Sequence, residues 1–257
     1  MLQINDVNKT FNKGTVDAMP LFENFNLSVK KGEFVSIVGS NGSGKTTLLN
    51  IIGGNIDIDS GKISIDDINI THLKEYKISK MVGRVFQNPT LGTAENMTIA
   101  ENLVLAENKT KMYNLRIGIN KKRMEYYKFL LSTLGLGLED KLNVKVGSLS
   151  GGQRQALTLL IATMTPIDLL LLDEHTAALD PKTSQDIMEL TNKIVNEKKI
   201  TTLMVTHNLR FAVEYGSRLL MFNEGNVIID KSGIDKQNLK INDILDTFNK
   251  ISIECGN

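Results

Sequence analysis

The chain has 257 residues, of which 30 are lysine or arginine and 29 are aspartate or glutamate, so its formal net charge is +1. This balance excludes a global basic field that would attract nucleic acid or anionic lipid, and we expect no nucleic-acid partner. The length suits one large α/β domain, or a core that carries a smaller inserted subdomain.

Short runs in the first third of the chain alternate apolar and polar residues, which is typical of strands with one buried face. Phe25, Leu27 and Val29 form one such run, and Ile63 and Ile65 form another. We therefore expect an antiparallel sheet region here. Residues 34–38 read FVSIV, an almost continuous apolar run that is typical of a strand buried on both faces in a parallel sheet.

Helical spacing replaces this pattern from residue 88 to about residue 164, where we expect an inserted helical subdomain. One predicted helical face carries Met124, Tyr127, Leu130, Leu131 and Leu134. Gly135 is the expected stop of that helix. Thr98 and Glu101 have the spacing of a capping box, which predicts another helix start.

Residues 39–46 read GSNGSGKT and lie between the apolar run and a further apolar helical segment. In this context the glycines let backbone N–H groups turn toward a polyphosphate, and the helix N-terminus adds positive potential. Lys45 would supply a cation to the terminal phosphates, and Thr46 would place a hydroxyl on Mg²⁺. The alternative is a glycine-rich turn that only caps a helix. The predicted nucleotide-binding residues of the loop are Gly39, Ser40, Asn41, Gly42, Ser43, Gly44, Lys45, Thr46 and Thr47.

The segment LSGGQ, residues 149–153, consists of Leu149, Ser150, Gly151, Gly152 and Gln153. Ser150 and Gln153 fit a capping box, so the plain interpretation is a helix start. Two adjacent glycines are poor helix formers, however, each disfavoured by roughly 1 kcal/mol relative to alanine, and a cap does not need them. Close approach of bare amides to a phosphate explains the glycines better.

A third segment, residues 169–174, reads LLLLDE and places two carboxylates at the end of a predicted buried strand, where ligands gather in open α/β sheets. We expect Asp173 to hold Mg²⁺ indirectly, for example through a water, and Glu174 to polarise the water that attacks the γ-phosphate. The run LMVTH predicts another strand, which ends at His207. Considered alone, these residues would also fit an ordinary turn and a hydrogen-bonded loop histidine.

The order of the three motifs, phosphate loop, LSGGQ and acidic strand end, resembles the ATP-binding subunit of a bacterial ABC transporter. This resemblance implies an α/β fold: a P-loop NTPase (RecA-like) core with an antiparallel β subdomain and an inserted α-helical subdomain. It implies ATP hydrolysis, with ATP and Mg²⁺ as the bound groups. The implied catalytic residues are Glu174, His207 and Gln87, and the implied Mg²⁺ ligands are Thr46, Gln87 and Asp173.

Individual roles also follow from the resemblance. His207 would contact the γ-phosphate, and Gln87 would touch Mg²⁺ and the attacking water. Phe11 would stack on the adenine ring, and Asp180 would communicate between two subunits. On residue type alone, Gln87 would be a surface residue, Phe11 a core aromatic, and Asp180 the cap of the helix that begins at Pro181.

In the family, LSGGQ faces the nucleotide of a second copy across a head-to-tail dimer, so the signature residues are expected to act in trans. The other expected partners are an integral membrane permease, contacted by residues 89–110, and an extracytoplasmic substrate-binding protein. The N-terminal sequence lacks the pattern of a secretion signal, and polar residues interrupt the apolar stretch 157–172. The lone Cys255 suits a reducing compartment. We expect a cytoplasmic protein bound to the inner face of the cell membrane through its permease.

Within this family, residues 92–103 are similar to the ATPase subunits of amino-acid uptake systems, which favours an importer. The alternative is a non-transport ATPase of the same superfamily, such as an iron–sulfur assembly scaffold subunit. The expected organisation is a core over residues 1–87 and 165–230, an insert over 88–164 that carries the signature, and a helical tail over 231–257. Ile244, Leu245 and Phe248 predict an amphipathic helix in that tail.

Overall fold

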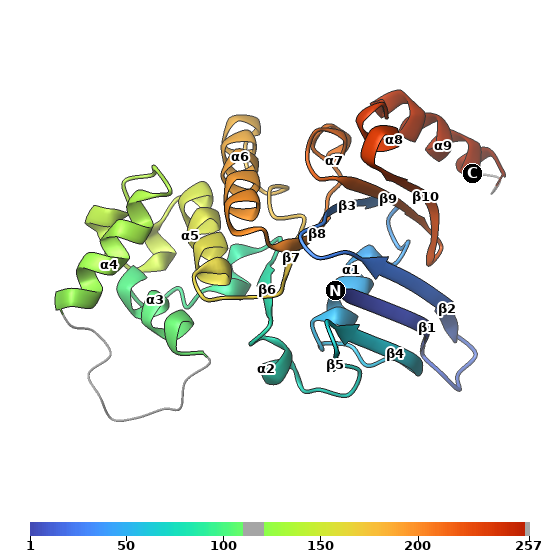
Figure 1. Cartoon of the computed structure of the whole chain (residues 1–257), viewed down its shortest axis with the longest axis horizontal. Coiled ribbons are helices and arrows are strands. Elements are labelled where there is room, and N and C mark those ends of the chain that lie inside the picture. The colour runs from blue at the N-terminus through green and yellow to red at the C-terminus, as the bar shows by residue number, and fades with distance from the viewer. Residues whose placement is uncertain (110–120, 255–257) are drawn as a thin grey trace. The chain divides into compact units, whose positions relative to one another are not determined.

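The computed structural model describes residues 1–109 and 121–254. Residue 110, the last of the predicted permease contact, and Cys255 lie outside these ranges. The chain forms two compact units, one made of Met1–Ser79 with Lys199–Asn257 and the other of Lys80–Lys198. Each unit contains both strands and helices (Figure 1).

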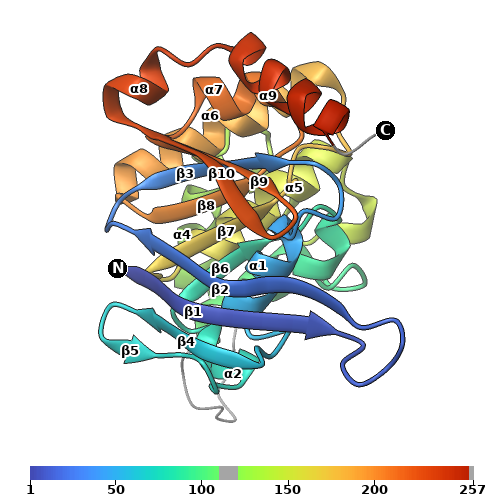
Figure 2. The same ribbon diagram turned by 90° about the vertical axis from the view of Figure 1, so that its right-hand side faces the viewer.

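An antiparallel sheet forms one part of the first unit, with β1 between β2 and β4 and with β5 beside β4 (Figure 2). Its strands are β1 (Leu2–Phe11), β2 (Met19–Val29), β4 (Ser60–Ile65) and β5 (Ile68–Asn69). Phe25, Leu27 and Val29 of β2 are buried, whereas the residues between them are exposed. Ile63 and Ile65 of β4 are buried as well. The predicted antiparallel region is therefore confirmed.

The same unit contains a second group of hydrogen-bonded strands in the order β10, β9, β3, β8. Their bounds are β3 (Phe34–Gly39), β8 (Thr201–Val205), β9 (Arg218–Asn223) and β10 (Asn226–Ser232). Strand β3 runs parallel to β8 and β9, whereas β10 returns antiparallel to β9. Every residue of β3 is buried, as expected for a parallel strand covered on both faces. The strand predicted from the FVSIV run is confirmed.

Helices of the first unit follow or cover these strands. They are α1 (Lys45–Ile52), α2 (Glu75–Ile78), α7 (Leu209–Glu214), α8 (Gly233–Gln237) and α9 (Ile241–Glu254). In α9, the fully buried Ile244 belongs to one apolar cluster with Val38 of β3, Ala212 of α7 and Met221 of β9. Helix α9 is therefore anchored to the strands that flank the phosphate loop.

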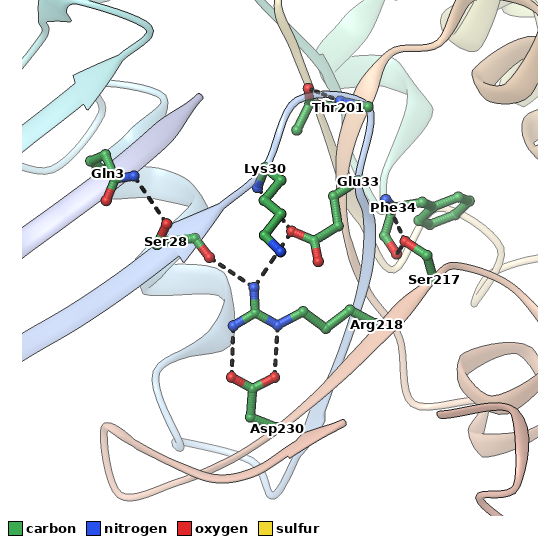
Figure 3. A network of polar contacts seen from close by, with 10 residues as sticks. Gln3, Ser28, Lys30, Glu33, Phe34, Thr201, Ser217, Arg218 and Asp230 are labelled. Atoms are coloured by element: carbon green, nitrogen blue, oxygen red, sulfur yellow. Dashed lines mark hydrogen bonds and ion pairs between the residues drawn. The ribbon is translucent and has the colours of Figure 1, made fainter. Parts of the chain in front are cut away.

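Arg218, at the start of β9, links the antiparallel sheet to the parallel strands of the first unit (Figure 3). Its Nε and Nη2 donate to the two carboxylate oxygens of Asp230 at 2.7 and 2.6 Å. Its Nη1 donates to the carbonyl oxygen of Ser28 in β2 at 2.8 Å and lies 3.5 Å from Glu33 Oε2. The hydrogen bonds that Arg218 donates to Asp230 are the main cause that raises the pKa of Arg218. Burial opposes this shift, and the charges of Asp230 and Glu33 add to it. Charge-assisted bonds thus connect β2, β9 and β10.

In the described part of the second unit, strand β6 (Val82–Val85) pairs in parallel with β7 (Leu169–Asp173). The longer helices are α3 (Ile99–Asn108), α4 (Lys121–Ser132), α5 (Gly151–Thr163) and α6 (Pro181–Lys198). Short 3₁₀ turns are η1 (Pro89–Gly92), η2 (Glu139–Lys141) and η3 (Val146–Ser148). Every residue of β7 is buried, as its leucine run predicts.

The helices of the second unit share an apolar core in which Tyr127 and Leu131 of α4 are fully buried. The Tyr127 hydroxyl donates to Glu107 Oε2 at 2.6 Å, so the buried phenol is hydrogen-bonded. Gly135, three residues beyond the end of α4, has a φ of 67°. Thr98 and Glu101 form the predicted capping box at the start of α3. The predicted helical face, its stop and the helix start are all confirmed.

The predicted division into a core, an insert over 88–164 and a tail over 231–257 stays a prediction. The compact units group β6 and β7 with the helices of the second unit, and α8 and α9 with the first. Among residues 1–109 and 121–254, no helix combines the length and the apolar character required to cross a membrane.

Candidate active site

The phosphate loop of the first unit connects β3 to α1, and its residues contact the side chain of Lys45. The Lys45 ammonium donates to the carbonyl oxygens of Gly39 and Ser40 at 2.9 and 2.7 Å. It also lies 3.4 Å from Ser43 Oγ. The loop has this shape because Gly42 and Gly44 adopt φ values of 78° and 101°, which side chains disfavour.

Neighbouring elements fix the loop in place. The amide of Gly225, in the turn between β9 and β10, donates to the Ser43 carbonyl at 3.1 Å. Gly39 passes so close to the Phe222 carbonyl oxygen that a Cβ atom there would overlap it. Ser40, Asn41, Gly42 and Thr46 are exposed, whereas Ser43, Gly44 and Lys45 are buried and Thr47 is half-buried. The loop therefore presents an accessible rim around a buried cation.

His207 and the phosphate loop line one cavity of about 290 Å³. His207 is exposed and lies between β8 and α7. The other lining residues are Val38, Gly39, Ser40, Asn41, Thr206, Leu209, Leu245 and Phe248. The structure thus brings His207 to the loop, and two apolar side chains of α9 complete the wall. The role of His207 toward a γ-phosphate stays a prediction.

Phe11 ends β1, where it is half-buried. The Lys9 ammonium lies 5.3 Å from the centroid of its ring, a cation–π distance. The ring therefore lies at the C-terminal end of β1, and its stacking on adenine stays a prediction.

The acidic strand end of the second unit contains an ion pair that sequence reasoning missed. Asp173, the last residue of β7, pairs with Arg84 of β6, with Nη2 and Oδ2 3.2 Å apart. The exposed fractions of the two side chains are 12% for Arg84 and 10% for Asp173, so water screens this pair weakly. Arg84 interrupts an otherwise apolar strand, and a charge buried in a strand requires a partner. That requirement is the signal that could have revealed the pair.

Glu174, the predicted general base, has a φ of 46°. This left-handed conformation is rare for a residue with a side chain and costs of order 1–3 kcal/mol. The Ala177 amide donates to the Glu174 carbonyl at 2.9 Å, which closes a turn around the residue. Glu174 is thus half-buried and lies in a strained turn directly after β7.

His175 is buried directly after Glu174, with 3% of its surface exposed. Its Nε2 lies 3.2 Å from Thr191 Oγ1 of α6. The Thr191 hydroxyl already donates its hydrogen to the Ile187 carbonyl at 2.7 Å, so it accepts from His175. Burial lowers the pKa of His175 to about 4. A neutral ring with its proton on Nε2 therefore anchors the turn to α6.

The LSGGQ segment forms the N-terminus of α5. Ser150 Oγ accepts from the Gln153 amide at 3.3 Å, and Gln153 Oε1 accepts from the Ser150 amide at 3.4 Å. The predicted capping box is confirmed. Leu149 is buried, whereas Ser150 and Gly151 are exposed. The helix N-terminus is therefore open to a ligand.

The two glycines of LSGGQ also have a packing role that the sequence did not show. A Cβ atom on Gly152 would overlap Thr183 Cγ2 of α6, and one on Gly151 would lie 3.2 Å from Leu179 Cδ2. The Gln153 side-chain amide donates to the Leu136 carbonyl at 3.3 Å. Packing against Leu179 and α6 is thus one reason for the glycines, and trans recognition of a phosphate stays a prediction.

Gln87 and Asp180 complete the predicted set within the second unit. Gln87 follows β6 and is exposed, two residues before η1. Asp180 caps α6, because its Oδ1 accepts from the Thr183 amide at 3.0 Å. Hydrogen bonds from the side chain and then the backbone of Thr183 lower the pKa of Asp180. The capping role is confirmed, and the communication between subunits stays a prediction.

The predicted Mg²⁺ ligands are a hydroxyl from Thr46, an amide oxygen from Gln87 and a carboxylate from Asp173. All three are oxygen donors of the kind that Mg²⁺ binds, and Thr46 and Gln87 are exposed. Each residue, taken by itself, therefore has the chemistry of a Mg²⁺ ligand. Thr46 belongs to the first unit and the other two residues to the second.

Comparison with known proteins adds sequence and fold relationships. The family model described as "ABC transporter" matches residues 22–177. The chain is 50% identical to the "Tyrosine transport ATP-binding protein" of Clostridioides difficile (strain R20291), over 96% of this chain and 98% of that protein. It is 30% identical to the "Phosphonates import ATP-binding protein PhnC" of Lactococcus lactis subsp. cremoris (strain SK11), over 90% and 92% of the two chains.

A solved structure is similar to most of this chain. It is the dimeric post-hydrolysis state of the ATP-binding cassette MJ0796 bound to ADP and Pi, with 32% sequence identity and a TM-score of 0.76. The likeness covers 90% of this chain and 98% of that chain. The predicted P-loop NTPase fold is therefore confirmed.

Proposed function

The chain belongs to the ABC transporter family, and from this premise we propose that it powers the uptake of an amino acid through a separate membrane permease. It is the ATP-binding and ATP-hydrolysing subunit of such a transporter. The observation that carries the ATP-binding role is the glycine loop around Lys45, in which a buried ammonium group lies beside exposed loop residues at a helix N-terminus.

ATP binding uses the first unit. The amides of the phosphate loop and the N-terminus of α1 would surround the polyphosphate, and the Lys45 ammonium would exchange its carbonyl partners for phosphate oxygens. Phe11 would stack on the adenine ring. His207 would donate a hydrogen bond to the γ-phosphate from the cavity that it shares with the loop.

Hydrolysis would use Glu174 as the base that orients and polarises the attacking water, with Gln87 as a second contact to that water. Bound Mg²⁺ would neutralise charge on the phosphates, and Thr46, Gln87 and Asp173 would hold it. The strained turn at Glu174 supports its role, because such backbone conformations cluster at functional sites.

The functional unit would be a head-to-tail dimer in which the LSGGQ helix of each copy faces the nucleotide of the other. The exposure of Ser150 and Gly151 at the N-terminus of α5 supports this arrangement. The dimeric cassette MJ0796 is a related assembly bound to ADP and Pi. Asp180, which caps α6, would communicate between the two copies.

Amino-acid cargo is favoured by the relative described as a tyrosine transport ATP-binding protein, since it shares half of its residues with this chain. The permease would contact the helical region that begins at residue 89, and an extracytoplasmic binding protein would deliver the cargo. In this arrangement the chain would lie in the cytoplasm at the inner face of the membrane.

The test has a biochemical arm and a cellular arm. Lys45→Ala should abolish nucleotide binding measured by calorimetry, whereas Glu174→Gln should bind ATP and accumulate a dimer on size exclusion without turnover. In cells that lack the native gene, the unaltered chain should restore uptake of labelled tyrosine and co-purify with a polytopic membrane protein.

Glu197→Gln, on the exposed surface of α6, is the matched control and should behave as the unaltered chain. Restored ATPase activity without any uptake, together with co-purification of a soluble scaffold, would contradict the transport function. Unchanged ATP affinity in Lys45→Ala would contradict the site assignment.

A further inference from the structure

Arg84 lies in the middle of β6 and reaches toward the end of the neighbouring strand. In the parallel register, Arg84 is opposite Leu171, two residues before Asp173. A side chain of this length can span that step, and Arg84 Nη2 lies 3.2 Å from Asp173 Oδ2. Since both side chains are almost fully buried, water screens their attraction weakly.

The Arg84 guanidinium makes a second contact, with an aromatic ring. Its central carbon lies 4.5 Å from the centroid of the Phe86 ring, a stacking distance. Phe86 directly precedes Gln87, and the Phe86 carbonyl accepts from Gln155 Nε2 of α5 at 3.5 Å. Arg84 therefore contacts both the Asp173 carboxylate of β7 and the ring of Phe86, the residue that follows β6.

We propose that Arg84 is a positioning residue that orients the Asp173 carboxylate and acts as its counter-ion. This inference rests on the proposed function, in which Asp173 helps to hold Mg²⁺. Two consequences follow. Without a divalent ion, the guanidinium compensates a buried carboxylate that would otherwise destabilise the fold. With the ion bound, the same positive charge repels it, so Arg84 weakens the affinity for Mg²⁺ while it keeps Asp173 in a productive orientation.

The experiment compares the unaltered chain with Arg84→Met, which keeps much of the side-chain length and removes the charge. Binding of a fluorescent ATP analogue is titrated with Mg²⁺ at fixed nucleotide concentration, in the Glu174→Gln background to prevent turnover. We expect Arg84→Met to reach half-saturation at a lower Mg²⁺ concentration than the unaltered chain, by a factor of up to about ten. In the Glu174-containing enzyme, we expect kcat to fall by about tenfold while KM for ATP changes little.

Thermal unfolding supplies a readout that does not depend on turnover. Without Mg²⁺, Arg84→Met should unfold at a lower temperature than the unaltered chain. Mg²⁺ with the nucleotide should raise its unfolding temperature more than it raises that of the unaltered chain. Arg84→Lys, which keeps the charge, should retain a Mg²⁺ midpoint within about threefold of the unaltered chain.

Arg123→Met is the matched control, because Arg123 Nη2 pairs with Glu107 Oε1 at 3.1 Å within the same unit. It should leave the Mg²⁺ midpoint unchanged. A midpoint for Arg84→Met that is unchanged, or shifted to higher Mg²⁺, would overturn the inference. A loss of folded protein alone would reduce the signal without moving the midpoint. If the unaltered chain itself bound no nucleotide, the proposed function would be wrong, which is a distinguishable result.

Discussion

His175 donates a hydrogen bond from Nε2 to the hydroxyl of Thr191, and this bond joins the turn after Glu174 to helix α6. The ring is buried, and burial lowers its pKa to about 4 from an ordinary value of 6.5. The bond therefore depends on a ring that stays neutral at physiological pH.

This depressed pKa predicts a loss of stability in mild acid. Between pH 6.5 and pH 4 the unfolded chain binds a proton at His175 that the folded chain does not bind. The contribution of His175 is thus fully present above about pH 6.5 and is lost as the pH falls toward 4. We expect the free energy of unfolding to fall by about 2 kcal/mol more between pH 7.5 and pH 5 in the unaltered chain than in His175→Asn. Urea titrations at the two pH values measure the difference. The control is His72→Asn, at an exposed histidine, and its free energy of unfolding should fall between the two pH values as much as that of the unaltered chain.

Glu174 predicts a conflict between stability and turnover. Asparagine tolerates the left-handed conformation better than glutamate does, so Glu174→Asn should raise the free energy of unfolding by about 0.5–1 kcal/mol. The same variant should lose ATP hydrolysis by more than a hundredfold, because it lacks the base. Equilibrium denaturation and a phosphate-release assay provide the two measurements. A destabilised Glu174→Asn protein would show that contacts of the glutamate outweigh its backbone strain.

Gly152 offers a way to separate packing from phosphate recognition. Gly152→Ala should destabilise the fold by about 1–3 kcal/mol, because the new methyl group meets Thr183 Cγ2. Thr183→Ser removes that methyl group, so the double variant should regain most of the stability. If Gly152 also approaches a phosphate of the second copy, the double variant should remain defective in ATPase activity. Full recovery of ATPase activity in the double variant would show that Gly152 is needed only for packing.

Arg218 predicts an order of effects on stability. Arg218→Met leaves Glu33 without its guanidinium partner, and the exposed fraction of the Glu33 side chain is only 13%. Asp230→Asn alters a side chain that is 47% exposed and keeps the bond from Arg218 to Ser28. We expect losses of about 2 kcal/mol for Arg218→Met and below about 1 kcal/mol for Asp230→Asn. Chemical denaturation of both variants tests the order, and equal losses would contradict it.

Patterns in the sequence predicted much of this fold, because burial on one or both faces of a strand requires a recognisable order of apolar and polar residues. The continuous apolar run of β3 and the alternation in β2 correspond to strands buried on two faces and on one. The capping boxes at Thr98 and Ser150 were also predictable, since each depends on residues only three positions apart.

Contacts between distant residues could not be predicted in the same way. The Arg84–Asp173 pair joins residues 89 positions apart, and only the register of two parallel strands brings them together. The bond from His175 to Thr191 depends on where α6 packs. The strain at Glu174 has no sequence pattern at all, because it is a property of the turn.

Leu245 and Phe248 line the same cavity as His207. A probe attached there could therefore report optically whether nucleotide is bound. Leu245 is 42% exposed, so it can carry an environment-sensitive dye through a cysteine substitution. A ligand that enters the loop would change the polarity around the dye, and emission from the last helix would then report each binding event as it occurs.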